Sequence, residues 1–256
     1  MKVAAYQAPL DATNSADAVG LLRERVVWCE SNGVEILCCP EAMLGGLADY
    51  AARPADVAFE AEGGRFEELL APLASDTVTT IIGFTELGRD GRLYNSAAVF
   101  HKGSVAGVYR KLYPAINKSV YEAGREAPVF TVAGLTFGIL ICNDSNYYEP
   151  AEIMASRGAA ALFVPTNNGL PPSKAGPELV ALSRSVDIAR AVENSVYVIR
   201  ADVAGSADGM VSHGSSGIVD PDGVVLRTAR QLAPEVIVAD IKPAPREPRP
   251  TPFGLR

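Results

Sequence analysis

The sequence predicts an α/β fold in which two mixed β-sheets pack face to face and helices cover their outer faces, a four-layer α-β-β-α sandwich. Short apolar, β-branched segments alternate with helical segments in both halves of the chain, which favours strands joined by helices. Tight turns that contain glycine join other apolar segments directly, which favours antiparallel hairpins between and after these units. Because a helix covers only one face of a sheet, the two uncovered faces are expected to pack against each other.

The first half of the chain is expected to run β-α-β-α and then into hairpins. The first helix has Asn14 or Ser15 as its N-cap and Gly33 just past its end. Segments 88–91 and 101–103 are tight turns between neighbouring strands. The predicted strands are 2–8, 34–39, 78–86, 93–100 and 104–110, and the predicted helices are 15–31 and 64–76.

The second half is expected to run through a hairpin, a β-α-β-α-β unit and a final hairpin. The predicted strands are 129–132, 135–141, 160–165, 195–201, 217–220, 224–228 and 235–241, the helices are 149–157 and 176–193, and 204–217 is a Gly/Ser-rich loop. Residues 1–241 are therefore expected to form a single domain. Residues 242–256 hold five prolines among 15 residues and should form an extended arm, because proline disfavours helix and central strand.

Composition excludes several classes of protein. Hydrophobic residues make up 48% of the chain, which excludes disorder as its main state, and the formal net charge of −7 argues against nucleic acid as a partner. No apolar stretch reaches the ~18 residues that span a bilayer, so no membrane partner is expected. Pro9 and Asp11 interrupt the N-terminal segment before a signal-peptide core, so a cytoplasmic protein is expected. With only two histidines and no clustered ligands, neither a metal nor another cofactor is expected.

Three reactive side chains follow apolar strands, which is where α/β sheets carry their sites. Glu41 stands at the mouth of an apolar layer, which suits a general base. Lys111 ends a strand, where its ammonium could stabilise an oxyanion or move a proton. Cys142 lies at a strand-to-loop corner that would expose its sulfur for nucleophilic attack. Taken singly, each also fits an ordinary role, and the remaining cysteines are expected to be buried hydrophobes: Cys29, Cys38 and Cys39.

Together, the three segments resemble the catalytic motifs of the nitrilase superfamily, the carbon–nitrogen hydrolases. The segments are Pro40-Glu41, Tyr109-Arg110-Lys111-Leu112 and Ile141-Cys142-Asn143-Asp144. The similarity extends over nearly the whole chain. Residues 3–7 look like the family's first strand, 190–194 like its helix-to-strand signature and 214–223 like its late hairpin.

The resemblance implies a mechanism and an assembly. Cys142 would attack the carbon of a small-molecule substrate, a linear amide or N-carbamoyl compound, and form a thioester. Glu41 would be the base, and Lys111 would stabilise the oxyanion together with the backbone N–H of Asn143. The family is usually dimeric through its helical faces, so the resemblance implies a homodimer or higher homo-oligomer.

One departure from the family pattern concerns a second glutamate, which the family commonly has before an aromatic-x-x-Gly. Ser119 stands at that position, and Glu122 is offset from it by three residues. Either Glu122 or another group serves instead, or the function of the second glutamate is absent. The loop 165–172 resembles the loop that lines the family's substrate pocket. The substrate-binding candidates are Tyr113, Glu122, Asn167 and Asn168.

Other functions remain open at this stage. The same site could hydrolyse a nitrile, or could pass its acyl group to an amine rather than to water. The serine at position 119 would also fit a non-catalytic binding protein on this scaffold. A Cys–His hydrolase would pair Cys142 with His213, although nothing in the sequence supplies its third, orienting residue.

Overall fold

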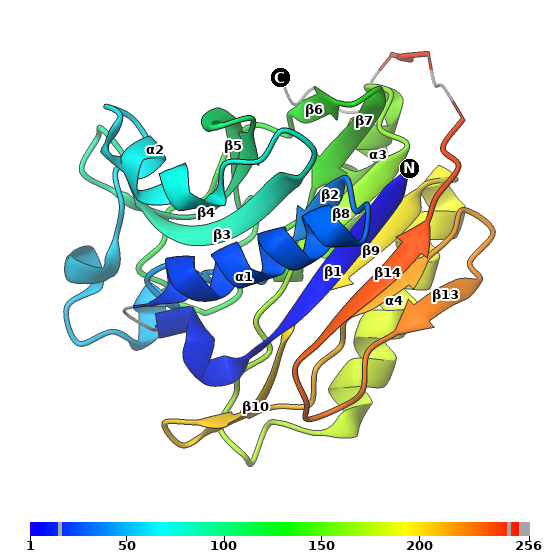
Figure 1. Cartoon of the computed structure of the whole chain (residues 1–256). Helices are drawn as coiled ribbons and strands as arrows, with labels where there is room; N and C mark the ends of the chain where they lie inside the picture. The colour runs from blue at the N-terminus through cyan, green and yellow to red at the C-terminus, as the bar shows by residue number, and fades with distance from the viewer. Residues whose placement is uncertain (15–16, 245–246, 251–256) are drawn as a thin grey trace.

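The computed structural model describes residues 1–14, 17–244 and 247–250, and Figure 1 shows two β-sheets with helices outside them. Helices α1 (Ala18–Ser31) and α2 (Arg65–Leu70) pack on the first sheet, and α3 (Tyr148–Ser156) and α4 (Pro177–Asn194) pack on the second. The expected α-β-β-α sandwich is confirmed. Within the described ranges, no helix is both long enough and apolar enough to cross a membrane.

The first sheet is mixed and has β1 at its centre. Its order is β11-β10-β1-β2-β3-β4-β5, and β14 also pairs with β1. β14 runs antiparallel to β1 from Lys2 to Gln7, whereas β10 pairs in parallel with its end at Ala8. The strands are β1 (Lys2–Pro9), β2 (Ile36–Cys38), β3 (Thr79–Leu87), β4 (Leu93–His101), β5 (Ser104–Arg110), β10 (Val203–Ala207), β11 (Met210–Ser212) and β14 (Glu235–Asp240).

The second sheet is also mixed, with parallel strands at its centre. Its order is β13-β12-β9-β8-β7-β6, and the pairs β7–β8 and β8–β9 are parallel. The strands are β6 (Val129–Val132), β7 (Leu135–Ile139), β8 (Ala161–Pro165), β9 (Tyr197–Ala201), β12 (Gly217–Val219) and β13 (Val225–Thr228). The short 3-10 segments of the chain include η1 (Leu10–Asn14), η2 (Ala48–Tyr50), η3 (Pro54–Val57), η4 (Ala71–Leu73) and η5 (Cys142–Asn146).

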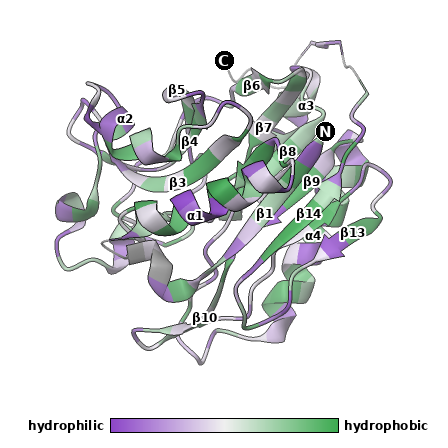
Figure 2. Ribbon diagram, viewed as in Figure 1, coloured by the Kyte–Doolittle hydropathy of each residue, from purple (hydrophilic) through white to green (hydrophobic). Residues whose placement is uncertain are grey.

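The alternation of side chains along β1 separates two cores. Val3 and Ala5 point into the core between the two sheets, whereas Ala4 and Tyr6 point into the core under α1. Both faces of the strand are therefore buried, which explains why it is apolar almost throughout. Figure 2 shows that β14, which pairs with β1, is largely apolar, while α1 alternates between apolar and polar positions because only one of its faces is covered.

Three sequence-based boundaries need correction. Segment 204–217 is not a loop throughout, because β10 and β11 form a hairpin about Asp208 and Gly209, both of which have positive φ. The expected helix 64–76 ends at Leu70 and continues as η4, since Pro72 cannot donate the next helical hydrogen bond. α1 begins at Ala18 with Asp17 as its N-cap, whereas the expected N-cap Asn14 ends η1 and the alternative Ser15 lies outside the described residues.

Candidate active site

Glu41 lies just beyond β2 and is 2% exposed. Its Oε1 accepts a hydrogen bond from Asn95 Nδ2 of β4 at 2.7 Å, and its Oε2 accepts one from the backbone N–H of Asn167 at 3.0 Å. The turn that carries it presses on β3 at Gly83, where an added Cβ would lie 2.3 Å from the carbonyl oxygen of Pro40. Glycine at this strand position therefore allows the close approach that buries the carboxylate.

Lys111 follows β5 and is 3% exposed. Its Nζ donates to Glu41 Oε1 at 2.6 Å, its backbone N–H donates to the carbonyl of Asn95, and its carbonyl accepts from the N–H of Gly124. Burial acts to lower the pKa of the ammonium, but the attraction of Glu41 and the proximity of Cys142 outweigh it, so the pKa is raised. The ammonium therefore stays charged, with its Nζ held by Glu41 and the backbone of Lys111 held by Asn95 and Gly124.

Cys142 begins η5 and adopts a φ of 47°, in the left-handed region that non-glycine residues rarely occupy. The carboxylate of Asp144 holds this turn in shape. It accepts hydrogen bonds from the N–H groups of Ile141 and Tyr113 and from the hydroxyl of Tyr109, at 2.7–3.0 Å. Backbone strain of this kind costs roughly 1–3 kcal/mol and persists where surrounding contacts enforce it.

Burial, more than the surrounding charges, favours the protonated thiol of Cys142 at neutral pH. Burial, and after it the negative charge of Glu41, raise the pKa of the thiol to about 12, although Lys111 and Arg200 oppose the shift. Ionisation of the thiol near neutral pH would therefore require a base, and Glu41 is the carboxylate whose charge acts most strongly on it. The N–H of Asn143 lies in the first turn of η5, where backbone N–H groups have no intrahelical acceptor. In the described part of the chain, no group of three or more His, Cys, Asp or Glu residues could hold a metal ion.

The first testable consequence is the pH dependence of Cys142 alkylation. With a pKa of about 12, roughly one thiol in ten thousand is ionised at pH 8, so iodoacetamide should react slowly and faster with each rise in pH. Glu41→Gln removes a charge that raises the pKa, so its rate profile should move to lower pH. Mass spectrometry measures the rates, with Cys142→Ala reporting any reaction of the buried thiols Cys29, Cys38 and Cys39. A rate plateau near pH 7 in the unaltered protein would contradict the prediction.

Comparison with known proteins identifies the family to which the chain belongs. A family model described as carbon-nitrogen hydrolase matches residues 2–248. The chain belongs to the carbon–nitrogen hydrolase family. The hydrolase is 31% identical over 229 residues to "Hydrolase in pqqF 5'region" of Pseudomonas protegens, covering 87% of this chain and 76% of that one. It is 28% identical over 221 residues to the deaminated glutathione amidase of Escherichia coli O157:H7, covering 83% and 79%.

The fold of the hydrolase is also that of solved nitrilase-superfamily structures. The amidase from Nesterenkonia sp. AN1 matches with a TM-score of 0.76 and 23% identity, over 94% of this chain and 93% of the other. That structure, of a mutant, shows the result of Michael addition of acrylamide at the active site cysteine of the Nesterenkonia protein. This structure shares the fold, and the family model over residues 2–248 confirms the expected membership of the nitrilase superfamily.

Tyr113 and Glu122, two of the predicted binding residues, lie in surroundings that differ from each other. The ring of Tyr113 stacks on that of Tyr147, with centroids 3.8 Å apart, directly beside the turn of Cys142. Glu122 is exposed, and its carboxylate lies 3.5 Å from the guanidinium of Arg92. The structure thus brings Tyr113 to the Cys142 turn and pairs Glu122 with a cation at the surface.

The other two predicted binding residues come from the loop after β8. Asn167 holds Glu41 through its backbone N–H, which leaves its side chain to accept from the N–H of Gly169. Asn168 instead turns to Asp202, which accepts from both its backbone N–H and its side-chain amide at 3.0 Å. Asn167 is therefore the one of the pair that touches the Glu41–Lys111 centre.

Two of the alternative functions depend on Ser119 and His213, and the structure shows the surroundings of both. Ser119, at the position of the family's second glutamate, donates to both oxygens of Asp49 at 3.0 Å. The N–H of Val120 donates to the same carboxylate, so these hydrogen bonds connect the loop of Ser119 to η2, which carries Asp49. The ring of His213 lies 3.4 Å from the side chain of Gln231.

Sequence reasoning missed several polar residues that support the site. Asn95 lies within β4 and binds Glu41, while its Oδ1 is buried with no hydrogen-bond partner among the described residues. Arg200 on β9 pairs with Asp187 on α4 and reaches Ser145 and Thr166. The available signal was a polar side chain inside a segment predicted to be a buried strand, because such groups need partners.

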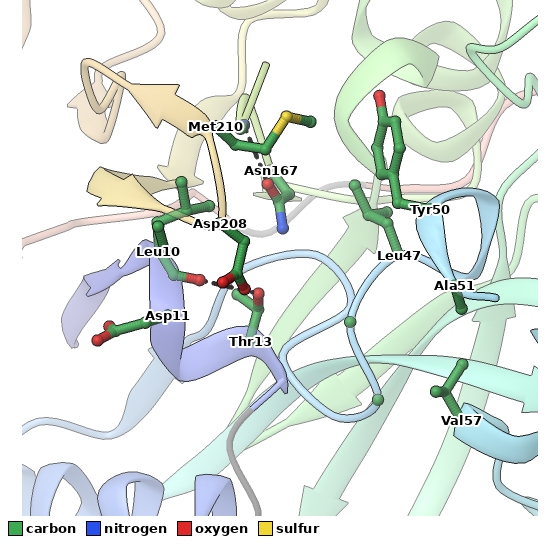
Figure 3. Close-up of a pocket in the computed structure, with 14 residues that line it drawn as sticks. Leu10, Asp11, Thr13, Leu47, Tyr50, Ala51, Val57, Asn167, Asp208 and Met210 are labelled. Atoms are coloured by element: carbon green, nitrogen blue, oxygen red, sulfur yellow. Dashed lines mark hydrogen bonds between the residues drawn. The ribbon is translucent and has the colours of Figure 1, made fainter. Parts of the chain in front are cut away.

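A cavity of about 350 Å³ is lined in part by Asn167, whose backbone N–H binds Glu41. Figure 3 shows the side chain of Asn167 directed into the space between Asp208 and Leu47. The charged residues that line the cavity are both acidic, Asp11 and Asp208, and apolar side chains complete much of the wall. The cavity is of a size that small-molecule sites have.

Proposed function

We propose that this carbon–nitrogen hydrolase cleaves a linear amide or N-carbamoyl bond through a thioester on Cys142. The observation that carries the proposal is the buried contact of Glu41 with Lys111 at 2.6 Å, whose two charges act on the Cys142 thiol. The names of relatives such as the deaminated glutathione amidase support an amide as the substrate. The acyl group would occupy the cavity at Asn167.

The first half of the proposed reaction makes the thioester. Cys142 Sγ attacks the carbonyl carbon while Glu41 accepts the thiol proton. The negative charge on the carbonyl oxygen is stabilised by the ammonium of Lys111 and the N–H of Asn143. Glu41 then returns the proton to the leaving nitrogen as the C–N bond breaks, and ammonia or an amine departs.

The second half releases the acid. Glu41 accepts a proton from water, and the resulting hydroxide attacks the thioester carbon. The same oxyanion donors act again, the C–S bond breaks, and Sγ recovers the proton from Glu41. Each group therefore ends in its starting protonation state, with one water consumed.

The charges of the cavity suggest which acyl groups it accepts. Because Asp11 and Asp208 are acidic and no Lys or Arg is among the lining residues of the described chain, a substrate carboxylate would meet only like charge. We therefore propose that neutral or amine-bearing amides are hydrolysed in preference to amides that carry a carboxylate.

A matched panel of primary amides tests both the activity and this preference. The three amides have equal chain length and end in a methyl, an ammonium or a carboxylate group, and ammonia release gives kcat/KM. We expect the carboxylate to be about fivefold or more poorer, the order of one exposed ion pair. Asp208→Asn should narrow the difference, whereas Asp222→Asn, an exposed turn residue outside the cavity, should not. No ammonia from any amide or carbamoyl compound would refute the proposed function, and equal rates on all three would refute only the preference.

A further inference from the structure

Arg200 is a buried cation that none of the three catalytic motifs contains. It lies on β9 and is 2% exposed. Its Nε donates to both oxygens of Asp187 on α4 at 3.0 Å, and its Nη2 donates to Oδ1 at 2.6 Å. A buried ion pair of this kind is weak evidence for stability, because desolvation opposes the attraction. The remaining donors of the guanidinium indicate what else it does.

One branch from Arg200 leads to the nucleophile. Nη2 donates to the hydroxyl of Ser145 at 2.9 Å, and that hydroxyl donates to the carbonyl oxygen of Cys142 at 2.8 Å. The carbonyl belongs to the residue whose φ of 47° is strained. The guanidinium is therefore connected to the strained Cys142 turn through the hydroxyl of Ser145.

The other branch leads to the base. Nη1 donates to the hydroxyl of Thr166 at 2.8 Å. The carbonyl of Thr166 accepts from the N–H of Glu41, and the next N–H, that of Asn167, donates to the Glu41 carboxylate at 3.0 Å. One planar group thus contacts both the turn of the nucleophile and the loop that holds the base.

We propose that Arg200 is a positioning residue: it holds the Cys142 turn and the loop after β8, which binds Glu41, in a fixed position relative to each other. The inference rests on the proposed function of these two groups. Its planar fork is suited to this task, because its donors diverge at fixed angles toward three separate elements. The positive charge of Arg200 also acts on the Cys142 thiol. Arg200 and Lys111 favour the thiolate of Cys142, and they oppose Glu41 and Asp202.

Two conservative variants test the branches without unpairing the ion pair. Ser145→Ala and Thr166→Val each remove one hydroxyl and leave Arg200 with Asp187. Each hydroxyl accepts a hydrogen bond from Arg200 and donates one to a backbone carbonyl, of Cys142 or of Val164, so each variant removes both. We expect kcat on the best amide of the panel to fall about twofold to tenfold with KM little changed. Ser156→Ala is the matched control, since its buried hydroxyl donates to the carbonyl of Ile153 three residues earlier, as Ser145 does to Cys142. It should lower the melting temperature comparably and leave kcat unchanged.

The charge is tested by alkylation of Cys142, which does not depend on amide turnover. Arg200→Met combined with Asp187→Leu removes both charges of the pair. Arg184, whose Nη1 lies 3.5 Å from Asp187, loses that carboxylate but keeps the carbonyls of Ser215 and Ser216 as acceptors. The iodoacetamide rate profile should move to higher pH. Arg200→Lys keeps the charge but not the fork, so it should lower kcat while leaving that profile nearly in place. If Ser145→Ala and Thr166→Val change kcat no more than Ser156→Ala does, or if the double variant leaves the profile unmoved, the proposal is wrong. A moved profile in a protein that hydrolyses no amide would support the role of Arg200 and refute the proposed function alone.

Discussion

Replacing Cys142 by alanine or by serine is expected to lower kcat by on the order of ten-thousandfold or more, because the covalent step is lost. Serine does not restore the rate, since its hydroxyl is a weaker nucleophile in the same place. The intact unaltered protein, quenched during turnover, should carry one acyl group on Cys142, detected by peptide mass spectrometry. An adduct on any other residue, or turnover that survives Cys142→Ala, would remove this mechanism.

The same position should separate stability from activity. Cys142 has a φ of 47°, which costs a side-chain-bearing residue about 1 kcal/mol or more relative to glycine. Cys142→Gly should therefore unfold at a higher temperature than Cys142→Ala although both are inactive. Calorimetry compares the two directly. The result would indicate that the nucleophile turn is strained for its function and not for the fold.

Lys111→Met is expected to be the most harmful single change to activity and stability together. It removes an oxyanion donor, which lowers kcat by about 10²–10³-fold. It also leaves the Glu41 carboxylate buried without its cation, which lowers the free energy of unfolding by about 3–5 kcal/mol. Urea unfolding measures the second effect. Arg230→Met is the comparison, because Arg230 is exposed where it pairs with the half-buried Glu235, and such a pair should contribute about 1 kcal/mol or less.

A second variant makes the stability argument specific. Glu41→Gln combined with Lys111→Met removes both charges, so it should recover at least about half of the stability lost in Lys111→Met, but none of the activity. The gain would be seen as a higher urea midpoint at unchanged slope. If the double variant is less stable than Lys111→Met, the cost does not come from an unpaired charge, and the electrostatic account of this pair fails.

The three motif residues could be predicted from sequence because each follows a strand and the motifs are local in the chain. Asn95 and Arg200 could not be assigned in the same way. Each lies inside a strand, and its partner is distant along the chain: Asn95 reaches Glu41 and Arg200 reaches Ser145. Hydrophobic periodicity indicates which positions are buried, but it does not indicate which buried polar groups meet.

The amino-acid sequence alone determined the α-β-β-α sandwich and the strand ends at which Glu41, Lys111 and Cys142 stand, since periodicity, turn residues and strand termini are local properties. It also raised the proposals for substrate class and a homo-oligomer, which remain predictions. Only the tertiary structure decided that Glu41 and Lys111 touch, that Glu122 pairs with Arg92 and that an acidic cavity adjoins Asn167. The physical reason is that these contacts join segments from different strands and loops, and their distances depend on how the two sheets pack and not on the order of residues.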